Sequence, residues 1–139
     1  MSETSTFCVD CSVTLAWCFE DERTARTDAL LDRLATQSAL APAIWCLEVA
    51  NALTTAERHG RLTALQVNRY VAAIRALPIV NAPVDTDSAF DSILPLARNH
   101  GLTAYDASYL ALALKTGLPL ATNDKDIIRS SSMLGVAVI

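Results

Sequence analysis

Short apolar runs alternate with longer amphipathic stretches along most of the chain. The short runs are predicted to be strands, at residues 6–9, 40–41, 79–80, 120–122 and 136–139. Between them, apolar residues recur at helical spacing and predict helices after residue 10, at about 22–36, after Pro42, at about 63–77, at 87–99, at about 104–115 and after Asp124. This alternation predicts an α/β protein, a three-layer α/β/α sandwich whose mostly parallel central sheet has about five short strands.

Several residues mark where the helices begin and end. Thr63 with Gln66, and Thr103 with Asp106, have the spacing of a capping box. Pro95 lies inside the predicted helix 87–99 and should kink or break it. No linker, repeat or low-complexity segment interrupts the pattern, so we expect a single domain over residues 1–139.

Composition narrows the class of protein. A chain of 139 residues that is 52% apolar can bury one sizeable core, and it is too short for two. There is no run of eighteen apolar residues, and the polar start MSETST lacks the features of a signal peptide, so we expect a cytoplasmic protein with no membrane segment. The net charge of −4 argues against a broad basic surface for nucleic acid.

The cysteines do not indicate a metal or redox site. Cys8 and Cys11 form a C-x-x-C motif, but a zinc site needs a second close pair and a redox motif usually opens a helix. We therefore predict that these cysteines serve as small buried apolar residues.

Four acidic residues occur where functional groups collect in a parallel sheet. Asp10 ends the first predicted strand, and Asp124 follows the strand 120–122, so both belong at the carboxyl edge of the sheet. Glu48 interrupts an apolar helix, where it either faces solvent beside Asn51 or meets a partner or a metal. Asp106 either completes a helix cap or points to the same edge as the other acids.

Three segments resemble the acidic motifs of the PIN-domain nucleases, in particular the VapC-type toxins of toxin–antitoxin pairs. They are FCVDCSVTLAWCFEDE, APAIWCLEVANAL and GLTAYDASYLALALKTGLPLATNDKDI, in the family's order over nearly the whole chain. The resemblance assigns the four catalytic acids of the family to Asp10, Glu48, Asp106 and Asp124. It assigns supporting polar positions to Ser12, Asn51 and Thr122. Asp126 is the alternative for the fourth acid.

The chemistry implied by the resemblance is metal-dependent hydrolysis of RNA phosphodiester bonds. Two carboxylates ~4 Å apart repel by about 4 kcal/mol at an effective dielectric constant of about 20, so a cation is expected among them. An all-oxygen ligand set suits Mg²⁺ or Mn²⁺. The metal would be held by Asp10, Asp106 and Asp124, while Glu48 would be a further ligand or would orient the attacking water.

The resemblance also implies partners. These are an RNA substrate, a second copy of the chain in a homodimer, and a cognate VapB-type antitoxin that blocks the acidic groove with an Arg or Lys. Two alternatives stay open: a PIN-domain RNA-processing nuclease that is not a toxin, and a PIN-like interaction module without catalysis.

Two departures from the family pattern are visible. Cys11 stands where small residues are usual, and could make the site sensitive to oxidation or to soft metals. The segment RSSSMLG is more polar than the family's usual alanine-rich last helix. The aromatic residues on the helices are predicted to lie in the core or at an interface, and are Trp17, Trp45, Tyr105 and Tyr109.

Overall fold

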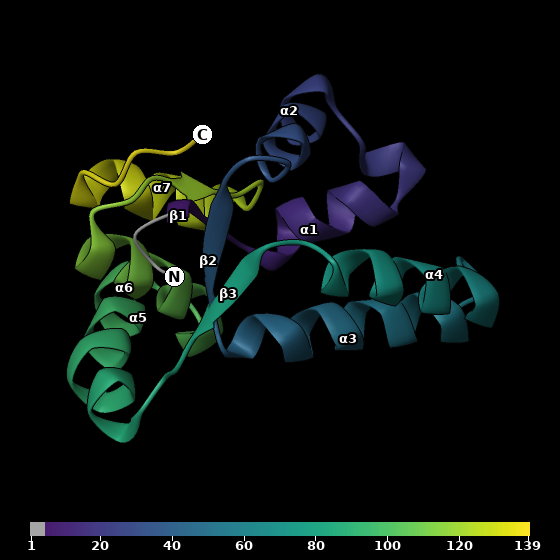
Figure 1. Cartoon of the computed structure of the whole chain (residues 1–139). Coiled ribbons are helices and arrows are strands. Elements are labelled where there is room, and N and C mark those ends of the chain that lie inside the picture. The colour runs from purple at the N-terminus through teal and green to yellow at the C-terminus, as the bar shows by residue number, and fades with distance from the viewer. Residues whose placement is uncertain (1–4) are drawn as a thin grey trace.

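A four-stranded parallel sheet forms the centre of the computed structural model, which describes residues 5–139 (Figure 1). Its strands are β1 (Ser5–Val9), β2 (Ser38–Pro42), β3 (Ile79–Ala82) and β4 (Leu120–Ala121). They lie in the order β3-β2-β1-β4, so the chain moves outward from β1 to β3 and then returns to place β4 on the other side of β1. The strand order reverses between β1 and β4, and their carboxyl ends form the topological switch point of the sheet.

Helices lie on both sides of this sheet, as predicted for an α/β/α sandwich (Figure 1). One side carries α1 (Cys11–Cys18), the short turn η2 (Glu20–Glu22), α2 (Ala25–Arg33), α3 (Ile44–Arg58) and α4 (Ala64–Arg75). The other side carries η3 (Ser88–Ile93), α5 (Leu94–His100), α6 (Ala104–Thr116) and α7 (Lys125–Leu134). Helix α6 contacts β1, β2 and β4 and is the central helix of its layer.

The predicted fifth strand at residues 136–139 is wrong. Only Val138 pairs with the sheet, in a single bridge to Leu120. The reason lies in β4, which is two residues long and already pairs with β1 along its other edge. A strand this short offers too few backbone groups for a longer ladder on its outer edge.

The helix boundaries follow local side-chain chemistry. Thr63 and Gln66 form the predicted capping box at the start of α4. The predicted helix 87–99 is not interrupted at Pro95; it changes winding just before it, from the π-helical η3 to α5, and Ile93 and Leu94 at the junction are both right-handed helical. Thr103 accepts the amide of Asp106 at 3.1 Å, but over residues 5–139 the Asp106 carboxylate makes no return bond to Thr103. The capping box at α6 is therefore only half formed.

Packing in the core holds helices α6 and α3 in place against the rest of the domain. Phe7 and Val9 of β1 are fully buried, and so is Leu110 of α6. On the other face, the indole of Trp45 donates to the Thr14 hydroxyl at 2.9 Å and thereby ties α3 to α1. Among the helices described, none has the length and apolar character needed to cross a bilayer.

Candidate active site

Asp10 follows β1 directly and caps the N-terminus of α1. Its Oδ1 accepts the Val13 amide at 3.1 Å and the Ser12 hydroxyl at 2.6 Å. Its Oδ2 accepts the Thr122 hydroxyl. The side chain is buried, and this burial raises the pKa of the Asp10 carboxyl, although the three hydrogen bonds lower it; the charge of Asp124 raises it further.

Two hydroxyls join the segment after β1 to the segment after β4. The Ser12 oxygen accepts the amide of Asn123 at 2.9 Å, and the Thr122 oxygen accepts the amide of Asp124 at 3.0 Å. Each hydroxyl donates to Asp10 at the same time. Ser12 and Thr122 therefore hold one acid directly and fix the backbone that carries a second.

Arg26 of α2 reaches the same segment from a distant part of the sequence. Its guanidinium donates to the Thr122 carbonyl at 2.8 Å and to the Asn123 side chain. Sequence analysis did not single out Arg26, because an exposed arginine in an amphipathic helix carries no local signal of this contact 96 residues away.

Asp124 and Asp126 are placed differently. Asp124 is half-buried and caps α7, and its Oδ1 accepts the amides of Asp126 at 2.9 Å and Ile127 at 3.0 Å. Asp126 is exposed and its carboxylate pairs with Arg129 at 2.8 Å. Asp124 also bears electrostatically on Asp10.

The charges of the other predicted acids act on the carboxyl group of Asp106. Burial, followed by repulsion from nearby carboxylates, raises the pKa of Asp106 to about 6. The contributing carboxylates, in decreasing order, are Asp124, Glu48, Asp10 and Asp126. The structure thus brings the four acids suggested by the sequence into one electrostatic site.

Glu48 meets a buried partner. It is half-buried on α3, and its Oε1 accepts the hydroxyl of Tyr109, which is 1% exposed on α6. Burial, followed by the bond to Glu48, raises the pKa of the Tyr109 phenol. Tyr109 lies in the core as predicted, but the sequence did not reveal its contact with Glu48. Asn51, one turn further along α3, is exposed.

Cys11 lines the acidic site as a protonated thiol. Burial, followed by the charges of Glu48 and Asp10, raises the pKa of Cys11 to about 12. Burial also raises the pKa of Cys8 to about 11, and both residues are free thiols. A thiolate is therefore strongly disfavoured at both positions of the C-x-x-C motif.

The donor set suits a hard divalent cation. It consists of carboxylate oxygens, the ligands that Mg²⁺ and Mn²⁺ prefer, and the pKa of Asp106 is raised by burial and then by a repulsion that a cation would relieve. In the part of the chain that the structure describes, no three His, Cys, Asp or Glu side chains are arranged to hold an ion as they stand. The chemistry of the residues fits a divalent cation, and its binding would require the carboxylates to draw closer together.

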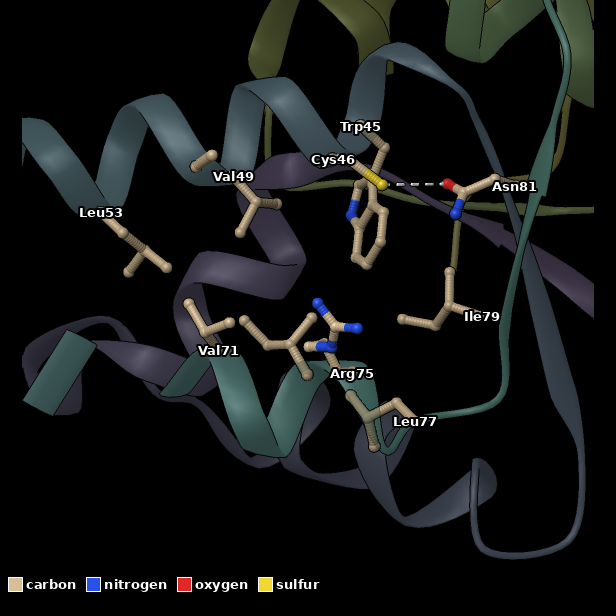
Figure 2. A pocket seen from close by; sticks show the side chains of 11 residues that line it. Trp45, Cys46, Val49, Leu53, Val71, Arg75, Leu77, Ile79 and Asn81 are labelled. Carbon is tan, nitrogen blue, oxygen red and sulfur yellow. Dashed lines mark hydrogen bonds between the residues drawn. The ribbon is translucent and has the colours of Figure 1, made fainter. Parts of the chain in front are cut away.

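A separate hollow lies between α3, α4 and β3 (Figure 2). It has a volume of about 460 Å³ and mostly apolar walls, with Val49 and Leu53 on one side and Val71 on the other. The thiol of Cys46 donates to Asn81 at its rim, at 3.4 Å. None of the four acids lines it, so this hollow is distinct from the acidic site.

An α/β/α sandwich with Asp10 and Asp124 at the switch point between β1 and β4, and with Asp106 within electrostatic reach of both and of Glu48, has the architecture of a PIN-like nuclease domain. The family model of the PIN domain matches residues 7–131. The chain belongs to the PIN-domain family.

Known relatives agree with this assignment. Ribonuclease VapC3 of Mycobacterium tuberculosis is 34% identical over 107 residues, which cover 76% of this chain and 74% of that protein. Exonuclease VapC9 of Pyrobaculum aerophilum is 33% identical over 81 residues, which cover 58% of each chain. The match to VapC9 therefore spans little more than half the length of that relative. The VapC-type resemblance seen in the acidic motifs is confirmed.

Solved structures share the fold. The crystal structure of PAE2754 from Pyrobaculum aerophilum superposes with a TM-score of 0.74 at 24% identity, covering 97% of this chain and 84% of that one. A toxin–antitoxin complex from Klebsiella pneumoniae contains a chain with a TM-score of 0.57 at 17% identity, covering 87% of this chain and 89% of that one.

Proposed function

We propose that the protein is a metal-dependent endoribonuclease that acts as the toxin of a toxin–antitoxin pair. The observation that carries the proposal is that Asp10 and Asp124 follow two paired strands and act, together with Glu48, on Asp106, whose pKa is raised to about 6 by burial and by this repulsion. The names of the relatives support nuclease activity, since one is a ribonuclease and the other an exonuclease.

In this proposal Asp10, Asp106 and Asp124 hold Mg²⁺ or Mn²⁺. The bound ion would supply a polarised water for in-line attack on phosphorus and positive charge beside the phosphate. Glu48 is a further ligand or orients that water and accepts its proton. Ser12 and Thr122 keep the buried Asp10 carboxylate in one position through their hydroxyls.

Charge favours a cation among the four acids when RNA binds. The net charge of the chain, −4, equals the charge of the four acids when all are ionised. An RNA phosphate approaching these acids alone would meet repulsion, and a bound divalent cation reverses the local potential.

The test is cleavage of total cellular RNA by the purified protein with Mg²⁺ or Mn²⁺, beside EDTA and an Asp106→Asn variant. Defined internal fragments that vanish in both controls support the proposal. Progressive shortening from the ends would instead assign exonuclease activity. A folded, metal-supplied protein that cleaves no RNA would contradict the nuclease proposal and favour a PIN-like binding module.

A matched pair of variants tests the fourth acid. Asp124→Asn should abolish cleavage, whereas Asp126→Asn should leave it within about twofold, because Asp126 is exposed and paired with Arg129. The reverse result would assign the fourth position to Asp126.

An apolar groove beside the acids supports partner binding. It has a volume of about 470 Å³ and includes Leu47 and Tyr105, the residues that directly precede Glu48 and Asp106. Leu47 is 68% exposed and Phe90, also in the groove, is 64% exposed, so a large apolar surface is open to solvent. We infer that a second copy of the chain covers this groove, and that Leu47→Asp would convert a dimer to a monomer in light scattering.

The toxin assignment predicts an antitoxin that places an Arg or Lys among the acids. The structural likeness to a chain of the Klebsiella pneumoniae toxin–antitoxin complex supports testing this. The product of the gene adjacent to this one, co-expressed with the protein, should co-purify with it and suppress cleavage. We therefore expect the activity in the cytoplasm.

A further inference from the structure

We infer that Tyr109 is a positioning residue for the reaction, whose hydroxyl holds the Glu48 carboxylate in place beside Asp106. The inference rests on the proposed nuclease function. It adds a residue from the core, outside the four acids and their Ser and Thr supports, to the machinery of the site.

The geometry places Tyr109 between the core and the acids. Its side chain is 1% exposed, and its hydroxyl emerges at Glu48, where it donates to Oε1. The two residues are 61 positions apart, so the bond joins α6 to α3 across the site. A ring packed this tightly cannot follow a moving partner, and the hydroxyl therefore marks a fixed point for the carboxylate.

Helical spacing explains why this residue serves the site. Tyr109 follows Asp106 by three positions on α6, so the two side chains lie on one face of the helix. The same helical face thus presents one acid of the site and the donor that fixes another.

Glu48 needs such a donor because its own helix does not hold it. A glutamate side chain has three rotatable bonds and loses rotamer freedom when fixed. The charge of Glu48 also acts repulsively on Asp106, which favours rotamers that carry the Glu48 carboxylate away from the site. The hydrogen bond from the Tyr109 phenol to the Glu48 carboxylate opposes both effects.

The first experiment is steady-state cleavage by Tyr109→Phe, which keeps the ring and removes only the hydroxyl. We expect kcat to fall about 10- to 100-fold, the range typical of lost supporting partners, while KM changes by no more than about twofold. Tyr70→Phe is the matched control, since Tyr70 is half-buried on α4 and lies outside both the four acids and the apolar groove, and it should keep the wild-type kcat.

Making Tyr109→Phe in a Glu48→Asp variant distinguishes a positioning role of Tyr109 from general support of the fold. In Glu48→Asp the shorter side chain no longer reaches the phenol, so adding Tyr109→Phe should lower kcat by no more than about twofold further. An equal loss in both backgrounds would mean that Tyr109 acts only through the fold. A wild-type kcat in Tyr109→Phe would also overturn the inference.

A third measurement needs no turnover. Three-bond scalar couplings of the Glu48 side chain, recorded by NMR, should report one rotamer in the wild type and averaged rotamers in Tyr109→Phe. Averaged couplings in both proteins would overturn the inference. A wild-type protein that cleaves no RNA contradicts the proposed function, whereas unchanged couplings contradict the positioning role of Tyr109.

Discussion

The Thr122 hydroxyl donates to Oδ2 of Asp10, so the residue that follows β4 holds the acid that follows β1. The two strands pair in parallel with Val9 opposite Ala121, which makes Asp10 and Thr122 the next positions in the same register. The Asp10 amide also donates to the Ala121 carbonyl at 3.1 Å. The sheet itself, rather than a loop, therefore sets the position of this acid.

Replacing Thr122 by Val should weaken both the fold and the activity. Valine keeps the shape but leaves the carboxylate of Asp10, which is 2% exposed, without one of its three donors. A hydrogen bond to a charged group contributes about 1.5–3 kcal/mol, and we expect a loss of that size in urea unfolding at pH 7. Cleavage should fall about 10-fold or more. Thr122→Ser keeps the hydroxyl and should retain most of the stability and most of the cleavage activity. A Thr122→Val variant as stable as the wild type would contradict the role of this hydrogen bond.

Asp106→Asn should abolish cleavage and stabilise the metal-free protein. The folded-state pKa of Asp106 is about 6, above its ordinary value of 3.8. The folded state therefore keeps a proton that the unfolded state releases, and stability should fall as pH rises from about 4 to 6. Because the side chain is half-exposed, solvent screening limits the effect to on the order of 1 kcal/mol.

The measurement is the urea midpoint of chelator-treated protein between pH 4 and pH 7.5. Asp106→Asn should flatten the slope across this range and unfold at higher urea than the wild type at pH 7. Asp32→Asn, which removes an exposed acid that is not among the carboxylates acting on Asp106, should keep the slope. An Asp106→Asn variant with the wild-type slope would show that Asp106 is not the titrating group.

Most of the fold could be predicted because its signals are local. The capping box at Thr63, the change of helical winding next to Pro95 and the order of strands and helices each depend on residues close in sequence. The fifth strand could not be predicted correctly, since the apolar pattern of residues 136–139 suits a strand but its length depends on the two-residue neighbour β4. Strand pairing is a property of two segments, and one of them was too short.

The sequence indicated the four acids, but it indicated only some of the residues that hydrogen-bond to them or to their backbone. Asp10 and Asp124 follow strands, which places them at the switch point by topology alone. Tyr109 and Arg26 act on groups 61 and 96 residues away, and in sequence they resemble an ordinary core aromatic and an ordinary surface charge. Such partners become visible only when distant segments are brought together.

Cys11 should resist alkylation in the folded protein. Burial and the neighbouring acids raise the pKa of its thiol to about 12, so at pH 8 its thiolate is scarcer than in a free cysteine by on the order of 1000-fold. Iodoacetamide at pH 8 should label the exposed Cys46 well before Cys11, as read by peptide mass spectrometry. Labelling in urea, where both thiols are accessible, is the control. Equal labelling of the two cysteines in the folded protein would contradict this prediction and support an oxidation-sensitive site.

Ser131→Ala should stabilise the protein, because the last helix buries a hydroxyl that has no partner among the described residues. Ser131 is fully buried and its Oγ makes no hydrogen bond, so folding removes it from water without compensation. Ser132, its neighbour on α7, is exposed and is the matched control, since both substitutions gain the same helix propensity. We expect Ser131→Ala to exceed Ser132→Ala by about 1 kcal/mol in the free energy of unfolding, measured in urea. Equal effects would indicate that a buried water satisfies the Ser131 hydroxyl.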